Sequence, residues 1–222
     1  MAKRVVIIHG YQGEPMRGFR PWLKVELEAR GFSVSVPAMP SPDEPRVEDW
    51  VAAIAKEVGD AGKDCVLVGH SLGCAAILRY LESAERRVTN LGLKAEASGT
   101  EGGATRLGAP PLPEGKWLPH RGSSVAGAVL VAGFAERLGD EFRAIEGFVQ
   151  PPLDFGRVKK NCERMVAIFS DNDPYIPLSQ AEVFEKKLGA KVVVLHARGH
   201  FSSSEGTTEL PEARDAILGI SR

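Results

Sequence analysis

Short apolar runs recur along the chain and alternate with segments that carry a helical pattern. These runs contain few polar residues, so both of their faces must be covered when the protein folds. We predict six strands from them, at residues 5–8, 32–37, 65–68, 128–131, 165–169 and 192–195. Strands of this kind, separated by helices, are typical of an α/β fold with a mostly parallel, doubly wound sheet and helices on both faces.

The clearest helical segment ends just before Gly59. Its apolar residues recur at intervals of three and four, which puts them in one stripe: Val47, Trp50, Val51, Ile54 and Val58. Further helices are predicted for residues 20–30, 72–81, 178–188 and 210–220. Because one alternation runs through all 222 residues, we expect residues 1–222 to form a single domain.

A Gly- and Pro-rich stretch at residues 87–124 interrupts this alternation and includes "SGTEGGATRLGAPPLPEGKW". A loop of this length without secondary structure is either disordered or functional. We interpret it as a flexible surface insertion. Its bulky apolar residues, Trp117 and Leu118, leave open the alternative that it folds partly over a neighbouring cleft.

Charge and composition exclude several classes of function. The formal net charge is −1, so the protein has no field that would attract nucleic acid or an anionic membrane. The apolar run near the N-terminus, Val5 to Ile8, is too short for a signal peptide or a membrane span. Cys65 and Cys162 border apolar segments, which indicates buried, reduced thiols and a cytoplasmic protein.

The motif Gly69-His70-Ser71-Leu72-Gly73 lies between a predicted strand and a predicted helix. A nucleophile at such a sharp turn has a strained backbone, and its neighbours two positions away are crowded. Gly69 and Gly73 provide the room, so we predict Ser71 as the nucleophile above the carboxyl edge of the sheet. The backbone N–H of Leu72 is then the first donor to an oxyanion.

A serine nucleophile needs a histidine base and an acid that orients it, in the chain order Ser, acid, His. His200, in "ARGHFSSSEG", follows the last predicted strand and is the histidine that fits this order. The other histidines are less suitable, because they precede or adjoin the serine, lie in the insertion, or close the last strand: His9, His70, His120 and His196.

The acid is expected directly after the strand at residues 165–169, where "SDNDPYIP" contains Asp171 and Asp173. We favour Asp173, because one helix and one strand fit between it and His200. Asp171 is the alternative, with shaping of the turn as its other role, and Asp140 is a third candidate.

The second oxyanion donor is expected in the loop after the first strand, "IIHGYQGEP". The backbone N–H of Tyr11 or of Gln12 can face Ser71 there, and we favour Tyr11. His9 is interpreted as a structural residue that holds this loop. The sequence contains no phosphate-binding loop, dinucleotide motif or metal-ligand cluster, so we expect neither a cofactor nor a metal.

The segments "VVIIHGYQG", "VLVGHSLG", "FSDNDPYIP" and "GHF", in this order, resemble the α/β-hydrolase superfamily. They are most similar to the small serine hydrolases without a large cap domain, the retinoblastoma-binding protein 9 and YdeN-like family. The resemblance covers nearly everything except residues 87–124, where such proteins pass quickly to the next strand. It implies a minimal α/β-hydrolase fold, hydrolase activity and a catalytic triad of Ser71, Asp173 and His200.

The residues therefore predict a hydrolase that cleaves a small acyl substrate, namely an ester, thioester or amide, through an acyl-enzyme. One alternative is a catalytically silent protein-binding module that uses the insertion. Another is an acyltransferase whose acyl-enzyme is shielded from water. For that reading, the segment at residues 134–160 would overhang Ser71, and its phenylalanines would line an acyl pocket or pack as core: Phe142, Phe148 and Phe155.

Overall fold

The structure is a computed structural model that describes residues 3–60, 62–84, 124–162 and 164–222. The predicted insertion at residues 87–124 lies, apart from Ser124, outside the described residues. Its flexibility therefore stays a prediction, as does the extent of the single domain.

All six predicted strands form, and they make one sheet in which every neighbouring pair is parallel. In spatial order the strands are β2 (Ser33–Ser35), β1 (Arg4–Ile8), β3 (Cys65–His70), β4 (Gly127–Val131), β5 (Met165–Ser170) and β6 (Lys191–Leu195). The chain goes from β1 outward to β2, returns to β3, and then continues in the other direction. The carboxyl ends of β1 and β3 therefore flank the point where the strand order reverses, which is where open α/β sheets bind ligands.

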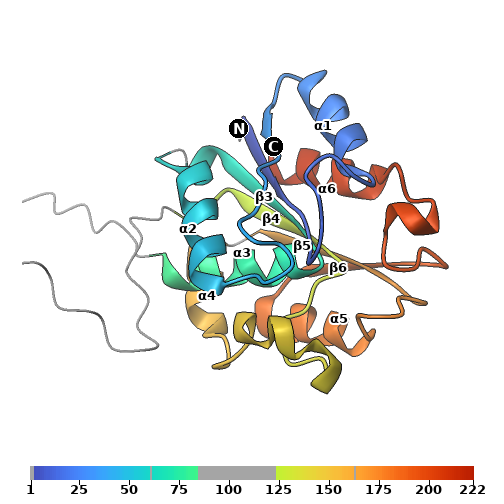
Figure 1. The fold of residues 1–222 in the computed structure, drawn as a ribbon. Coiled ribbons are helices and arrows are strands. Elements are labelled where there is room, and N and C mark those ends of the chain that lie inside the picture. Colours follow the sequence, from blue (N-terminus) through green and yellow to red (C-terminus); the bar gives the residue numbers. More distant parts are fainter. Residues whose placement is uncertain (1–2, 61, 85–123, 163) are drawn as a thin grey trace, which may run out of the picture.

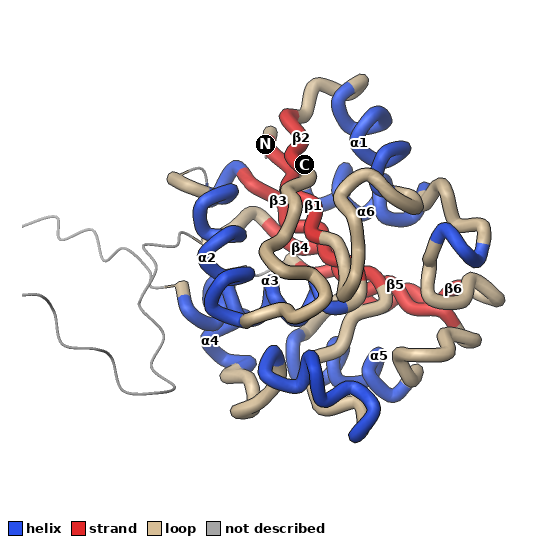
Figure 2. The backbone as a smooth tube through the Cα atoms, in the orientation of Figure 1, coloured by secondary structure: helices blue, strands red, loops and turns tan. Residues whose placement is uncertain are grey.

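Helices cover both faces of the sheet, as predicted (Figures 1 and 2). On one face α1 (Arg20–Glu28) packs against α6 (Pro211–Ile220), and α6 contacts β4 and β5. On the other face α3 (Leu72–Ser83) contacts β3 and lies between α2 (Val47–Val58) and α4 (Phe155–Asn161). This is the doubly wound α/β fold, and the described residues include no cap domain above the sheet.

The elements differ from the predictions mainly at their ends. The segment predicted as one helix at 178–188 is α5 (Ser179–Val183), continued by a π-helical turn, η3 (Phe184–Leu188). The longest elements that were not predicted are α4 and the 3₁₀ segment η2 (Asp140–Phe148). Both are short, and α4 begins at a polar cap, where Asp154 accepts a hydrogen bond from the Arg157 N–H, rather than from an apolar stripe. Two more short 3₁₀ segments are η1 (Gly62–Asp64) and η4 (Ser203–Glu205).

The core lies on both sides of β3 and β4, whose residues are all buried. Helix α3 is buried on every side over its first ten residues, from Leu72 to Leu81. The three cysteines are buried, as predicted for Cys65 and Cys162, and burial raises the pKa of the Cys65 thiol to about 12. Within the described ranges, no helix combines the length and the apolar character needed to cross a bilayer.

Candidate functional site

Ser71 lies at the turn between β3 and α3 in a strained backbone conformation, with φ of 54° and ψ of −121°. Positive φ is costly for a residue with a side chain and persists only where the surrounding structure enforces it. Here the Ser71 N–H donates to the carbonyl of Val131 in the neighbouring strand, at 2.9 Å. The turn is therefore tied to β4 at the residue that carries the hydroxyl.

The two flanking glycines allow this turn, as the sequence predicts. A Cβ atom at Gly73 would lie 2.5 Å from the carbonyl oxygen of Ile8 and 2.7 Å from that of His9. A Cβ atom at Gly69 would lie 2.8 Å from the backbone of Cys74. Because real Cβ atoms do not come so close to backbone atoms, only glycine lets α3 start this near to β1 and β3.

His200 lies in the loop after β6, and its ring is held by Asp173 from the loop after β5. The Nδ1–H of His200 donates to Asp173 Oδ2 at 2.8 Å, with Oδ1 at 3.1 Å. Asp173 Oδ1 also accepts from the N–H groups of Tyr175 and Ile176, at 2.9 and 3.0 Å. The side chains are 12% exposed for His200 and 2% for Asp173, so this pair lies in a largely desolvated place.

The backbone of His200 is held from two sides. The Nε2–H of His70 donates to its carbonyl at 2.8 Å, and its own N–H donates to Glu205 Oε2 at 2.8 Å. Burial, followed by the charges of His200 and Arg20, puts the pKa of His70 well below the ordinary value, so the ring stays neutral. His70 is therefore a buried hydrogen-bond donor that ties the loop after β6 to the end of β3.

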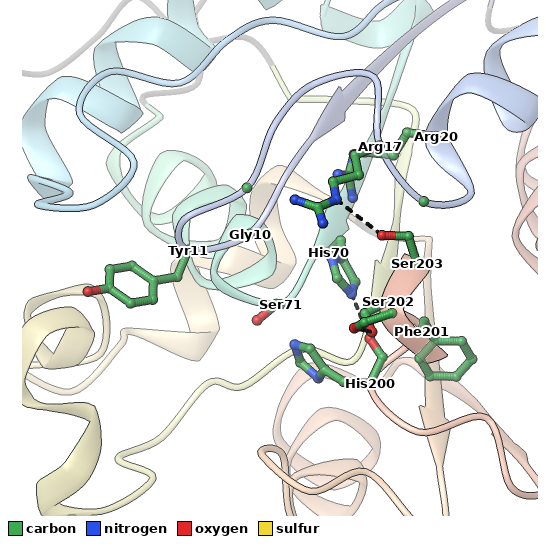
Figure 3. A pocket seen from close by; sticks show the side chains of 13 residues that line it. Gly10, Tyr11, Arg17, Arg20, His70, Ser71, His200, Phe201, Ser202 and Ser203 are labelled. Carbon is green, nitrogen blue, oxygen red and sulfur yellow. Dashed lines mark hydrogen bonds between the residues drawn. The ribbon is translucent and has the colours of Figure 1, made fainter. Parts of the chain in front are cut away.

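Ser71 and His200 border one pocket of about 250 Å³, and Figure 3 shows both side chains at this pocket. With Nδ1 protonated and bonded to Asp173, Nε2 is the nitrogen left to accept a proton. The hydrogen bonds of the described residues include none from Ser71 Oγ to His200 Nε2. Long or unaligned catalytic hydrogen bonds are common before substrate is bound.

The loop after β1 approaches Ser71 very closely, because a Cβ atom at Gly10 would be 3.0 Å from Ser71 Cβ. His9 holds this loop as interpreted: its Nδ1–H donates to the Gly10 carbonyl and its Nε2 accepts from the Met39 N–H. The next N–H group after Tyr11, that of Gln12, is used by the carbonyl of Pro42.

Among the described residues, the backbone N–H groups of Tyr11 and Leu72 are given no hydrogen-bond acceptor, unlike that of Gln12. The Tyr11 ring points away from Ser71, so that only its main chain faces the hydroxyl (Figure 3). This favours Tyr11 over Gln12 as the second donor to an oxyanion.

The other two candidate acids lie elsewhere. Asp171 accepts from the Ala197 N–H and pairs with His196, whose side chain is 91% exposed. Asp140 opens η2 and pairs with Arg137. Asp171 thus shapes the turn after β5, which was its alternative role, and Asp173 is the aspartate that contacts His200.

None of residues 134–160 borders the pocket beside Ser71, so the expectation that this segment overhangs the serine stays a prediction. Phe148 is buried and packs edge-on against Trp50 with ring centres 5.6 Å apart. Phe142 borders a separate small cavity, and the ammonium of Lys187 lies over the ring of Phe155, 5.4 Å from its centre. None of these three rings borders the pocket beside Ser71.

The pocket is bordered by further residues to which the sequence patterns assign no role. These are Arg17 in the loop from β1 to α1, Arg20 at the first position of α1, and residues 201–204 in the loop after β6. These residues follow strands whose carboxyl ends lie at this edge of the sheet. This position in the chain is the sequence feature from which their place at the pocket could have been predicted. No group of three or more His, Cys, Asp or Glu residues within the described ranges could hold a metal ion.

Comparison with known proteins agrees with this geometry. The model of the family described as "Serine hydrolase" matches residues 5–110 and 112–218. YdeN of Bacillus subtilis (strain 168) is 29% identical over 217 residues, covering 98% of this chain and 95% of that protein. Serine hydrolase RBBP9 of Rattus norvegicus is 24% identical over 205 residues, covering 91% and 89%. The crystal structure of the ydeN gene product from B. subtilis superposes with a TM-score of 0.76 at 28% identity, covering 98% of each chain.

Proposed function

This chain belongs to the serine hydrolase family, and from that premise we propose that it cleaves small ester-type substrates through an acyl-enzyme on Ser71. The substrate class comprises esters, thioesters and amides. The observation that carries the proposal is the buried Asp173–His200 hydrogen bond at the rim of the pocket that holds Ser71. A carboxylate in that position fixes the tautomer that leaves His200 Nε2 free to act as a base.

In the proposed reaction, His200 Nε2 takes the proton of Ser71 Oγ as this oxygen attacks the acyl carbonyl. The N–H groups of Leu72 and Tyr11 stabilise the tetrahedral oxyanion. His200 then gives its proton to the leaving group, which departs as an alcohol, thiol or amine. A water molecule next attacks the acyl-enzyme with His200 again as base, so that the acid is released and Ser71 recovers its proton.

Asp173 stays ionised throughout and stabilises the imidazolium that forms at His200. Its oxygens accept from the Tyr175 and Ile176 N–H groups as well as from the ring, so the carboxylate cannot easily turn away. A charge held in a desolvated place interacts with the imidazolium more strongly than it would in water.

The test is covalent labelling by a fluorophosphonate together with turnover of p-nitrophenyl esters of increasing acyl length. We expect the wild-type protein to be labelled and to turn over the shorter esters, and Ser71→Ala to lose both. Ser179→Ala, an exposed serine at the start of α5, is the matched control and keeps both. An unlabelled wild-type protein, or equal labelling of Ser71→Ala, would refute the proposal in favour of a silent binding module.

A further inference from the structure

The pocket beside Ser71 carries an unbalanced positive charge. Two arginines, Arg17 and Arg20, border it, and none of its bordering residues is an aspartate or a glutamate. Over the described part of the chain, neither guanidinium has a carboxylate oxygen within 4.0 Å, whereas at least nine other arginines and lysines do: Lys24, Arg30, Arg46, Arg79, Arg137, Arg143, Lys186, Lys187 and Arg214. Cations at a catalytic pocket without a counter-charge indicate a ligand that supplies one.

Arg20 is the more unusual of the two, because it is a charged residue that is only 5% exposed. Its guanidinium donates to two backbone carbonyls, Nη2 to Glu14 at 2.7 Å and Nε to Pro15 at 3.0 Å. Burial and the neighbouring charge of Arg17 lower its pKa to about 10, so it remains a cation at neutral pH. Carbonyl dipoles fix this cation in place, and the nearby Glu14 carboxylate, which forms no ion pair with it, offsets its positive charge only in part.

Arg17 is exposed and reaches over the pocket, above His70 in Figure 3. Its Nε–H donates to Ser203 Oγ at 3.2 Å, which attaches it to the opposite wall of the pocket. The other N–H groups of this guanidinium have no acceptor among the described residues. The planar fork of an arginine binds a carboxylate through two parallel hydrogen bonds, and Arg17 has the free donors to do so.

The carboxylates of the surrounding loops are already engaged. Glu205 Oε2 accepts from the N–H groups of His200 and Ser202 and from the Ser202 hydroxyl. Asp173 lies behind the His200 ring and takes three donors of its own. The Glu14 side chain is exposed and does not border the pocket. None of these groups therefore occupies the space in front of Arg17.

We propose that the pocket selects acyl substrates that carry a carboxylate a few bonds from the scissile carbonyl, with Arg17 binding that carboxylate and Arg20 adding a second positive charge. The inference rests on the proposed hydrolase function and deepens it by naming the substrate class. A volume of about 250 Å³ is at the small end for ligand pockets, which favours a short acyl group. Hemiesters of short dicarboxylic acids combine both properties.

The test compares two methyl esters of the same shape, the monomethyl ester of succinate and methyl isocaproate, in which an isopropyl group replaces the carboxylate. Acid release is followed in a pH-stat, and the ratio of the two kcat/KM values is the readout. We expect the wild-type protein to prefer the hemisuccinate by about tenfold or more, since a hydrogen-bonded charge pair contributes roughly that much.

Variants of Arg17 test whether the preference for the hemisuccinate depends on the charge of this side chain or on its planar shape. Arg17→Gln should lower the preference for the hemisuccinate by about tenfold to a hundredfold, and Arg17→Lys should keep part of it because the charge remains. Arg143→Gln is the matched control: it removes the same charge at an exposed position of η2, outside the pocket, and should keep the wild-type ratio. Equal turnover of the two esters by the wild-type protein, or an unchanged ratio in Arg17→Gln, would overturn the inference.

A second measurement distinguishes failure of the inference from failure of the proposed function. Succinate should slow fluorophosphonate labelling of Ser71 in the wild-type protein and not in Arg17→Gln. If labelling occurs and succinate leaves its rate unchanged, the anion site is refuted and the hydrolase proposal stands. If the wild-type protein is not labelled at all, the hydrolase proposal fails and the substrate class fails with it.

Discussion

At the scale of single residues, Asp171 and Asp173 leave the same strand two positions apart and yet contact different histidines. Asp171 pairs with the exposed His196, and Asp173 pairs with the nearly buried His200. The sequence orders these candidates by distance along the chain, and it cannot show which carboxylate turns toward the pocket. That choice depends on the N–H groups of Tyr175 and Ile176, which hold Asp173 in place.

The first prediction compares these two aspartates. Asp173→Asn should lower kcat for ester hydrolysis on the order of 10³–10⁴-fold, because the amide no longer fixes the productive tautomer of His200. Asp171→Asn should stay within about twofold of the wild-type kcat, since its pair with His196 is exposed and outside the pocket. Initial rates on one p-nitrophenyl ester measure both, and a larger loss in Asp171→Asn would contradict the assignment of the acid.

The second prediction concerns His70, which we regard as a positioning residue. Its Nε2–H donates to the His200 carbonyl, and the two rings are 5.0 Å apart. Removal of this donor in His70→Leu should lower kcat by about tenfold with little change in KM, because the ring of His200 is then less well oriented. In His70→Gln the side-chain amide can donate to the same carbonyl, so part of the lost kcat should return.

A different result would change the role of His70. If His70→Leu raises KM and leaves kcat unchanged, the residue contacts substrate rather than positioning the base. Thermal unfolding of both variants serves as the control, because a loss of kcat that follows the loss of folded protein would be a stability effect.

At the scale of elements, the site depends on the short distance between the first turn of α3 and the end of β1. The sequence predicts that Gly73 provides room at a crowded position, but it does not display what crowds it. The structure shows that the backbone oxygens of Ile8 and His9 lie where a Gly73 Cβ atom would be. The same closeness brings the Tyr11 main chain to Ser71. A change at Gly73 therefore moves the nucleophile and an oxyanion donor apart together.

The third prediction uses two glycines that lie in helices with different surroundings. Gly73→Ala should destabilise the protein by about 1–3 kcal/mol or more, because the new methyl group meets backbone that cannot yield easily. Gly219→Ala in α6 is the matched control, since nothing lies within 4 Å of its Cβ position. It should stabilise the protein by about 0.5–1 kcal/mol through helix propensity. Urea denaturation measures both, and a neutral Gly73→Ala would contradict the close approach.

At the scale of the whole molecule, the apolar runs are sufficient to predict the six strands. The four central strands are buried along nearly their whole length, whereas the edge strands β2 and β6 are only partly buried and still appear in the sequence as apolar runs. The glycine spacing around Ser71 and the chain order of Asp173 and His200 predict the positions that the fold brings to one edge. The pocket wall was not predictable in the same way. Arg17 lies in a loop with no periodicity and Arg20 at the first position of α1, and their orientation is set by Ser203 across the pocket and by backbone carbonyls, respectively.

For Phe142, Phe148 and Phe155, the sequence leaves an acyl pocket and the core open as alternatives. An apolar ring is buried wherever the fold offers apolar surface. Phe148 packs against Trp50 of helix α2, and a ring that makes this contact is not available to line a pocket beside Ser71. The spacing of phenylalanines in a loop does not distinguish the core from an acyl pocket, because both environments are apolar. Only the tertiary arrangement determines which of the two a given ring reaches.

The last prediction concerns how the stability of the folded protein depends on pH. Burial lowers the pKa of both His9 and His70, so the folded state keeps both rings neutral where the unfolded chain takes up protons. The unfolded chain therefore binds more protons below about pH 6.5, and the free energy of unfolding falls as the pH falls through that range. Each ring contributes at most about 1.4 kcal/mol per pH unit.

Urea denaturation at about pH 7.5 and about pH 5.5 measures this loss, and both values lie above the range in which the carboxyls with lowered pKa titrate, such as Asp171 and Glu205. The loss should be smaller in His70→Gln, which keeps a donor for the His200 carbonyl but cannot be protonated. If the wild-type protein and His70→Gln lose the same free energy between these pH values, His70 is not held neutral by the fold.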